Sequence, residues 1–170
     1  QFRQFWVQMA DADVVKYLPQ FSLASLEETQ ALIADHTADP GRRVAQKALA
    51  HEMTSLVHGD AAAREAESAA EVLFGGDPNV ASLDALAIVA GEVPLTDVSR
   101  ADLDDTFGLL ARAQVVSSTS EARRTIDQKG LRVNGSVLDK DETLASKGLL
   151  HDRYVLVRKG KTGYHLFRVS

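Results

Sequence analysis

In roughly the first half of the chain, apolar residues recur every three or four positions, which is the spacing of one face of an α-helix. The most regular apolar stripe covers residues 44–57. Ser25 and Glu28 form a capping-box pattern that predicts a helix over residues 25–37. Pro19 is expected to interrupt the apolar ladder that precedes it. Together these signals predict an antiparallel helical bundle.

Two further helices are predicted before the pattern changes. Asp60 caps an alanine-rich helix that should end near Gly75, and a short helix is expected over residues 82–89. Polar residues follow, and we expect a linker over residues 96–105. The helical domain is therefore predicted over residues 1–95.

Beyond this linker the apolar pattern changes to short runs bounded by turn residues. A short helix should end near Gln114, and Ser118 with Glu121 predicts a second helix that runs to about Gln128. Asn134-Gly135 lies between two short apolar runs, and this dipeptide is the strongest short-range signal for a β-hairpin. A second hairpin is predicted over residues 154–169. Residues 106–170 should thus form a small α+β domain, with two short helices on a mostly antiparallel sheet.

Charge divides the chain at nearly the same place. Residues 1–108 contain 7 Lys and Arg and 18 Asp and Glu, whereas residues 109–170 contain 12 and 6, so the overall net charge of -5 hides a basic second part. A basic domain of this kind points to a polyanionic partner. The chain has no cysteine, which excludes disulfides and thiolate metal sites, and its apolar runs are too short for a membrane helix. It begins at Gln1 without a signal-peptide pattern, and we expect it to be part of a longer polypeptide.

The common catalytic motifs do not account for the sequence. His51-Glu52 begins like a zinc-protease helix, but Ser55 stands where the second histidine ligand is needed. Residues 160–162 resemble the end of a phosphate-binding loop, yet Val155 replaces its leading glycine. We therefore predict no catalytic residues and no metal site in this chain.

The densest constellation of basic and capping residues covers residues 118–135. A capped helix N-terminus exposes free N–H groups suited to a phosphate, and arginines on the helix flank are charge-assisted donors. The alternative is that these are ordinary solvated charges on a helix and an edge strand. The basic surface is predicted to include Ser120, Arg123, Arg124, Lys129, Arg132, Asn134 and Lys159.

This stretch resembles the small RNA-binding domain named for ribosomal small-subunit protein four, over about residues 106–170. The resemblance rests on the Ser-x-x-Glu-Ala-Arg-Arg segment that starts at Ser118 and on Arg132-Val133-Asn134-Gly135. Thr119 departs from a position that is often basic in that family, which puts one phosphate contact in doubt. The preceding part is similar to the helical anticodon-binding region of bacterial tyrosyl-tRNA synthetase, through Gln4-Phe5-Trp6, Asp11-Ala12-Asp13-Val14, Tyr17-Leu18, Gln46-Lys47-Ala48-Leu49-Ala50 and Leu56-Val57-His58-Gly59.

The resemblance implies a tRNA-binding C-terminal portion of that synthetase. The parent enzyme would be a tyrosine–tRNA ligase of the cytoplasm that uses ATP with magnesium and forms a homodimer through its catalytic domain. The family's ATP-binding signatures are not found here, so this chain alone should be inactive, with no cofactor and no membrane association. The resemblance also suggests candidate contacts to the anticodon region, namely Asp11, Arg42, Arg43 and Lys47, although Asp11 is equally well explained as a helix N-cap.

Two other functions remain compatible with the residues. The basic domain also occurs in other RNA-binding proteins, such as pseudouridine synthases and ribosome-rescue factors, but the helical half argues against them. Alternatively, the acidic bundle is a protein-interaction module with a small α+β appendage and no RNA role.

Overall fold

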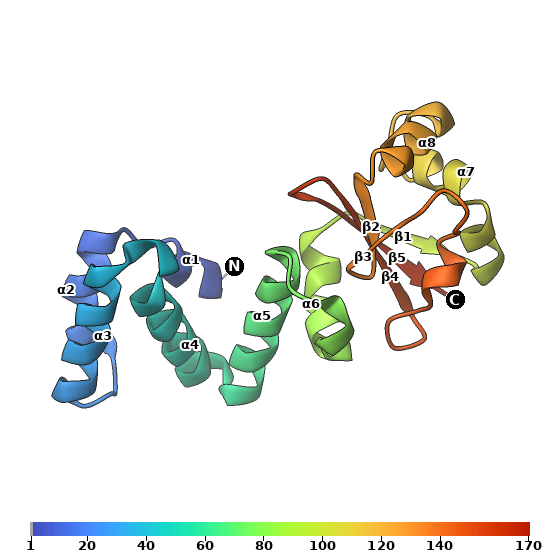
Figure 1. The fold of residues 1–170 in the computed structure, drawn as a ribbon. Coiled ribbons are helices and arrows are strands. Elements are labelled where there is room, and N and C mark those ends of the chain that lie inside the picture. The colour runs from blue at the N-terminus through green and yellow to red at the C-terminus, as the bar shows by residue number, and fades with distance from the viewer. Residues whose placement is uncertain (1) are drawn as a thin grey trace. The chain divides into compact units, whose positions relative to one another are not determined.

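The structure, a computed structural model, describes residues 2–170 and divides into two compact units. The first extends to Glu67 and is helical, and the second runs from Ser68 to Ser170 and contains a five-stranded sheet. The predicted fold class, a helical bundle followed by a small α+β domain, is confirmed (Figure 1).

In the helical unit, α4 is the element against which the other helices pack. Its apolar stripe buries Ala45, Leu49 and Met53 against Val14 and Leu18 of α2. Capping sets the ends of the helices as expected: Ser25 and Glu28 form a complete capping box, and Gly59, with φ of 87°, ends α4. The elements are α1 (Phe2–Val7), α2 (Asp11–Phe21), α3 (Leu26–Ala38), a 3₁₀ helix (Pro40–Arg42), α4 (Val44–His58) and α5 (Asp60–Leu73), which continues into the second unit.

The expected interruption at Pro19 was wrong, because Pro19 lies inside α2. A proline removes one main-chain hydrogen bond from a helix interior. Here the helix continues only two residues further, and the amide of Ser22 still donates to the carbonyl of Leu18. Burial of Val14 and Leu18 against α4 holds the helix across the lost bond.

The α+β unit is built on a sheet of strand order β1-β5-β4-β2-β3, in which β1 pairs parallel with β5 and the remaining pairs are antiparallel. Its elements after α5 are a 3₁₀ helix (Pro78–Val80), α6 (Leu83–Glu92), β1 (Leu95–Val98), a 3₁₀ helix (Arg100–Asp104), α7 (Thr106–Arg112), α8 (Thr119–Asp127), β2 (Leu131–Val133), β3 (Ser136–Val137), a 3₁₀ helix (Ala145–Lys147), β4 (Tyr154–Lys159) and β5 (Gly163–Val169).

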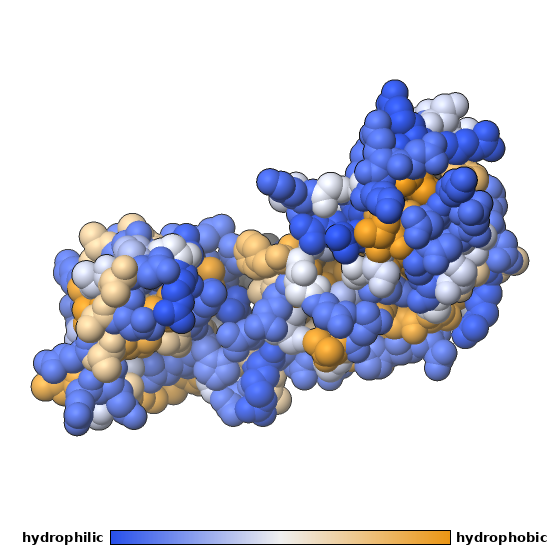
Figure 2. All heavy atoms as spheres, in the orientation of Figure 1, coloured by the Kyte–Doolittle hydropathy of each residue, from blue (hydrophilic) through white to orange (hydrophobic). Residues whose placement is uncertain are grey.

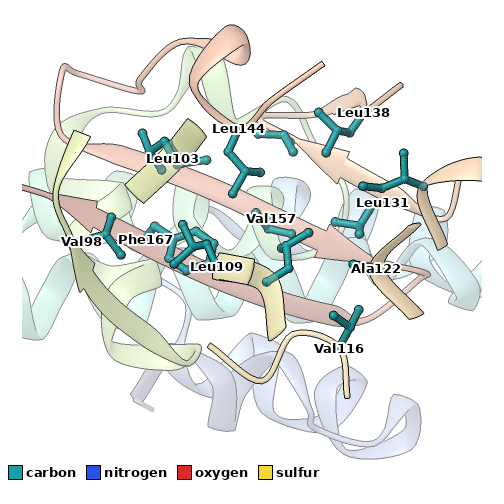
Figure 3. Close-up of a cluster of buried hydrophobic side chains, with 14 of the residues drawn as sticks. Val98, Leu103, Leu109, Val116, Ala122, Leu131, Leu138, Leu144, Val157 and Phe167 are labelled. Carbon is teal, nitrogen blue, oxygen red and sulfur yellow. The ribbon is translucent and has the colours of Figure 1, made fainter. Parts of the chain in front are cut away.

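Helices cover both faces of this sheet. On one face, Leu131, Val157 and Phe167 pack with Leu109 of α7 and residues of α8 (Figure 3). On the other face, a second apolar cluster joins side chains of β4 and β5 to the end of α5 and to α6. Because successive strand residues point to opposite faces, each face of the sheet packs against a different set of helices.

Of residues 96–105, expected as a linker, residues 96–98 belong to a strand of the sheet and Arg100–Asp104 form a 3₁₀ helix. Residues 95–98 are β1, which pairs with Leu166–Val169 of β5, and the next turn is helical. The guanidinium of Arg168 binds the carboxylate of Asp97, which lies opposite it in the register. The predicted division into residues 1–95, 96–105 and 106–170 thus differs from the compact units, because the apolar residues of α6 pack on the sheet.

Candidate nucleic-acid interface

The N-terminus of α8 is capped by a hydroxyl, as the sequence indicates. The Ser118 Oγ accepts a hydrogen bond from the amide of Glu121 at 3.1 Å. The reciprocal half of the expected capping box is absent, because the Glu121 carboxylate accepts from the amide of Ser117 at 2.7 Å instead. The first turn of α8 is thereby fixed from both sides, and its residues Thr119 and Ser120 stay exposed.

Lys159 of β4 links α8 to the sheet through an ion pair with Glu121. Its Nζ lies 2.7 Å from the Glu121 Oε1 and also donates to the carbonyl of Val115 at 3.4 Å. Hydrogen bonds from Lys159, and then from Ser117, lower the pKa of Glu121 to about 2. Of the predicted basic surface, Lys159 is therefore the member whose charge is already balanced within the fold.

The charges of Arg123 and Arg124 are not neutralised by carboxylates of the described residues. Both side chains are exposed on α8, and neither forms an ion pair with a carboxylate among residues 2–170. The Arg123 guanidinium lies 5.0 Å from the centroid of the Phe107 ring on α7, a cation–π contact that restrains the side chain without neutralising it. Lys129, just after α8, is exposed with φ of 55°. Figure 2 shows hydrophilic side chains over this helix.

Asn134 is part of the fold rather than of the surface. Its side chain is 5% exposed; the amide nitrogen donates to the carbonyl of Gly148 at 3.0 Å, and the amide oxygen accepts from the amide of Leu156 at 2.9 Å. Its φ of 48° and the φ of 85° at Gly135 form the predicted hairpin turn. A direct RNA contact by this side chain does not fit its position.

Arg132 was predicted to extend the basic surface of α8, but the structure places it elsewhere. Its neighbours in β2, Leu131 and Val133, are buried on the side of α7 and α8, so Arg132 belongs to the opposite face of the sheet. There it pairs in register with Arg158 of β4. Sequence reasoning missed Arg158, and only the register of β2 on β4, a pairing distant in sequence, could have revealed the two arginines together.

In the helical unit, Asp11 is anchored at the first position of α2. Its carboxylate Oδ1 accepts a hydrogen bond from the buried Gln46 amide at 2.7 Å, and the Nε2 of His36 lies 3.4 Å away. The N-cap is Ala10, so the interpretation of Asp11 as a helix N-cap was wrong. The Asp11 side chain is still 59% exposed, which leaves its second oxygen open to a partner.

The three basic side chains expected near the anticodon region differ in the contacts that they already make within the fold. Arg43 is half-buried and donates to the carbonyl of Met9 at 3.0 Å, so it holds the turn before α2. Arg42 lies 3.2 Å from the carboxylate of Asp35 at the surface, where such a pair contributes little. Lys47 is exposed and lines a broad groove with Leu23 and residues of α4.

Among residues 2–170, no group of three His, Asp or Glu side chains is placed to hold a metal ion. Within the same range, no helix has the length and apolarity needed to span a bilayer. The α+β unit presents a capped, cationic helix beside a small sheet, an arrangement suited to contact with a polyanion.

Comparisons with known proteins identify the family more closely. Residues 86–167 match the family described as the tyrosine–tRNA ligase SYY-like C-terminal domain. The tyrosine–tRNA ligase of Anaeromyxobacter dehalogenans strain 2CP-1 is 39% identical over 99% of this chain and 41% of its own length. That of Kineococcus radiotolerans is 41% identical over 94% of this chain and 38% of its own length.

The chain therefore spans about two fifths of the curated relatives that it matches. It is similar to the C-terminal part of bacterial tyrosine–tRNA ligases, which confirms the resemblance found in the sequence. The alternative of a protein-interaction module without an RNA role is not favoured by these matches.

Proposed function

We propose that this chain is the tRNA-binding C-terminal portion of a tyrosine–tRNA ligase, which holds tyrosine tRNA while the rest of the enzyme attaches tyrosine. The observation that carries the proposal is the pair Arg123 and Arg124, which are exposed beside the capped start of α8 and have no carboxylate partner within residues 2–170. Phosphate oxygens accept from arginine and from helix N-terminal amides, and such contacts fix register without reading sequence.

Only part of the predicted basic surface is proposed to contact RNA directly, namely the exposed residues on the α8 side. Ser120, Arg123, Arg124 and Lys129 would meet phosphates and sugars on the α8 side. Lys159 and Asn134 would contribute indirectly, since the first anchors α8 and the second forms the hairpin turn. From the family resemblance we further propose that the parent enzyme is a cytoplasmic homodimer that uses ATP with magnesium.

Charge reversal on α8 tests this proposal. Arg123→Glu with Arg124→Glu should weaken tRNA binding by the full chain at least tenfold, because contacts of about 1.5–3 kcal/mol are lost. Filter binding measures the affinity, and circular dichroism checks that the helical content is unchanged. The matched control is Arg100→Glu with Arg153→Glu, two exposed arginines of the same unit. Equal losses in both double variants, or none in the first, would contradict the proposed surface.

In the helical unit, Asp11 is proposed to accept a hydrogen bond from an unpaired base of the anticodon loop. Gln46 fixes one carboxylate oxygen and the other stays open, as a base-edge contact requires. Arg42 and Lys47 would supply nearby phosphate contacts, whereas Arg43 would support the turn that carries Asp11.

Base substitution in the anticodon tests the role of Asp11. Asp11→Ala should reduce discrimination between tRNAs that differ at one anticodon base more than it reduces affinity for all of them. Asp13→Ala, which removes the other exposed carboxylate from the first turn of α2, should leave discrimination unchanged. A uniform loss of affinity in Asp11→Ala, measured by competition binding, argues against base reading.

A further inference from the structure

A second basic site lies on the sheet face away from α8. A pocket of about 380 Å³ opens there between the sheet and the turn after α5, and Arg132, Arg158, Tyr164 and Gly75 are among the residues that line it. None of its lining residues is acidic. The pocket belongs wholly to the α+β unit and shares no lining residue with the α8 surface.

Two arginines that line this pocket lie side by side on the sheet and have no carboxylate counterion among residues 2–170. Arg132 and Arg158 are direct partners in the antiparallel register of β2 and β4, an arrangement that destabilises a sheet when the charges are alike. Neither guanidinium forms an ion pair with a carboxylate anywhere in residues 2–170; each donates to a main-chain carbonyl instead, Arg132 to Gly135 and Arg158 to Lys161. The nearby carboxylate of Asp77 is engaged by Asn79.

Two polar atoms of the same pocket are buried and unpartnered. The Nε of Arg158 and the hydroxyl oxygen of Tyr164 are both inaccessible to solvent and have no hydrogen-bond partner in the described chain. The two side chains are neighbours, with the Arg158 guanidinium 5.3 Å from the centroid of the Tyr164 ring. Buried polar groups are almost always satisfied, so this pair of donors points to an acceptor that comes from outside the fold.

The turn after α5 is shaped to let the guanidinium fit. Gly75 has φ of 95°, and a Cβ at this position would lie 2.7 Å from the Nη1 of Arg158. Glycine adopts this backbone conformation without strain and leaves room for the guanidinium. The turn thus lies against the Arg158 side chain at the pocket.

We propose that the Arg132–Arg158–Tyr164 pocket binds a single phosphate group. A planar guanidinium matches phosphate oxygens in a bidentate manner, the second arginine supplies further charge, and the tyrosine hydroxyl donates to a third acceptor. The source of the phosphate is a phosphodiester of the bound RNA, and this identification of the source rests on the proposed function. The α8 surface and this pocket would then hold RNA at two separate sites of one small unit.

Titration with inorganic phosphate tests the pocket without RNA. In the full chain, the Nε–H resonance of Arg158, assigned by its loss in Arg158→Lys, should shift saturably as phosphate is added at constant ionic strength. Arg132→Gln with Arg158→Gln should abolish phosphate binding, and Tyr164→Phe, which removes only the hydroxyl, should weaken it about threefold. The control Arg100→Gln should leave it unchanged.

Titration with tRNA then tests the source. The slope of log affinity against log salt should fall by about 0.7–0.9 in Arg132→Gln with Arg158→Gln, as expected for one neutralised phosphate. An unchanged slope, with phosphate binding intact in the wild-type chain, rejects RNA as the source and leaves free phosphate as the ligand.

The remaining outcomes separate this inference from the proposed function. If phosphate leaves the Arg158 resonance unmoved and the salt slope is also unchanged, the pocket is not a phosphate site, although the α8 surface can still bind tRNA. If the wild-type chain does not bind tRNA at all, the proposed function fails, and the phosphate titration alone decides on the pocket. Should the double arginine variant fail to fold, Tyr164→Phe provides the comparison for phosphate binding, and the single variant Arg132→Gln provides the comparison for the salt slope.

Discussion

The arginines of the helical unit and the two arginines of α8 differ in their partners. In the helical unit, Arg3, Arg42, Arg43 and Arg64 each contact an oxygen of the same unit. In the α+β unit, Arg123 and Arg124 have no carboxylate partner within residues 2–170, while Lys159 is held by Glu121. The difference shows that a count of basic residues overstates the surface available to RNA. The surface available to RNA depends on which basic side chains have no carboxylate partner within the described fold.

The hairpin turn at Asn134-Gly135 contains a polar side chain that is used by the fold rather than left open to RNA. Asn134→Ala should lower the free energy of unfolding of the α+β unit by about 3 kcal/mol, because it leaves the buried amide of Leu156 without a partner and removes the hydrogen bond to the carbonyl of Gly148. Urea denaturation measures this loss. Asn79→Ala, at an exposed residue that contacts the same turn, should cost about 1 kcal/mol or less.

An RNA contact by Asn134 would give a different result. In that case Asn134→Ala would weaken tRNA binding under conditions where the unit stays folded, with little change in stability. The expected result is the reverse, a clear loss of stability and near-normal affinity in the fraction that remains folded.

A smaller effect is expected at the anchor of α8. The pKa of Glu121 is lowered from 4.5 to about 2, chiefly by the hydrogen bond from Lys159, so its contribution to stability is complete above pH 4.5. This contribution should be lost as the pH falls from about 4.5 to about 2. Glu121→Gln should therefore be less stable than the wild-type chain at neutral pH, and the difference should shrink over that acid range. Parallel melting curves from pH 6 to pH 2 measure it, and a constant difference would show that Glu121 does not act through its charge.

Much of this architecture could be predicted from local signals. The capping box at Ser25, the apolar stripe of α4 and the Asn134-Gly135 turn all act over a few residues, and each forms as expected. Arg123 and Arg124 were predicted together because they follow a capped helix start.

Features that depend on distant pairing could not be predicted in this way. The strand over residues 95–98 has only four residues, two of them polar, and it forms because it pairs with the edge of β5 and Arg168 binds Asp97. Arg132 was assigned to the α8 surface because sequence order places it next to that helix, whereas the alternation of side chains along β2 directs it to the opposite face.

The central claim is that the open cations of α8 hold the RNA, and the salt dependence of tRNA binding tests it most directly. Arg123→Gln, Arg124→Gln and Lys129→Gln together should reduce the slope of log affinity against log salt by about 2.1–2.7, since each of the three phosphate contacts contributes about 0.7–0.9. Arg42→Gln with Lys47→Gln in the helical unit should reduce the slope less. An unchanged slope in the α8 variant, or a larger reduction in the helical-unit variant, would contradict the account.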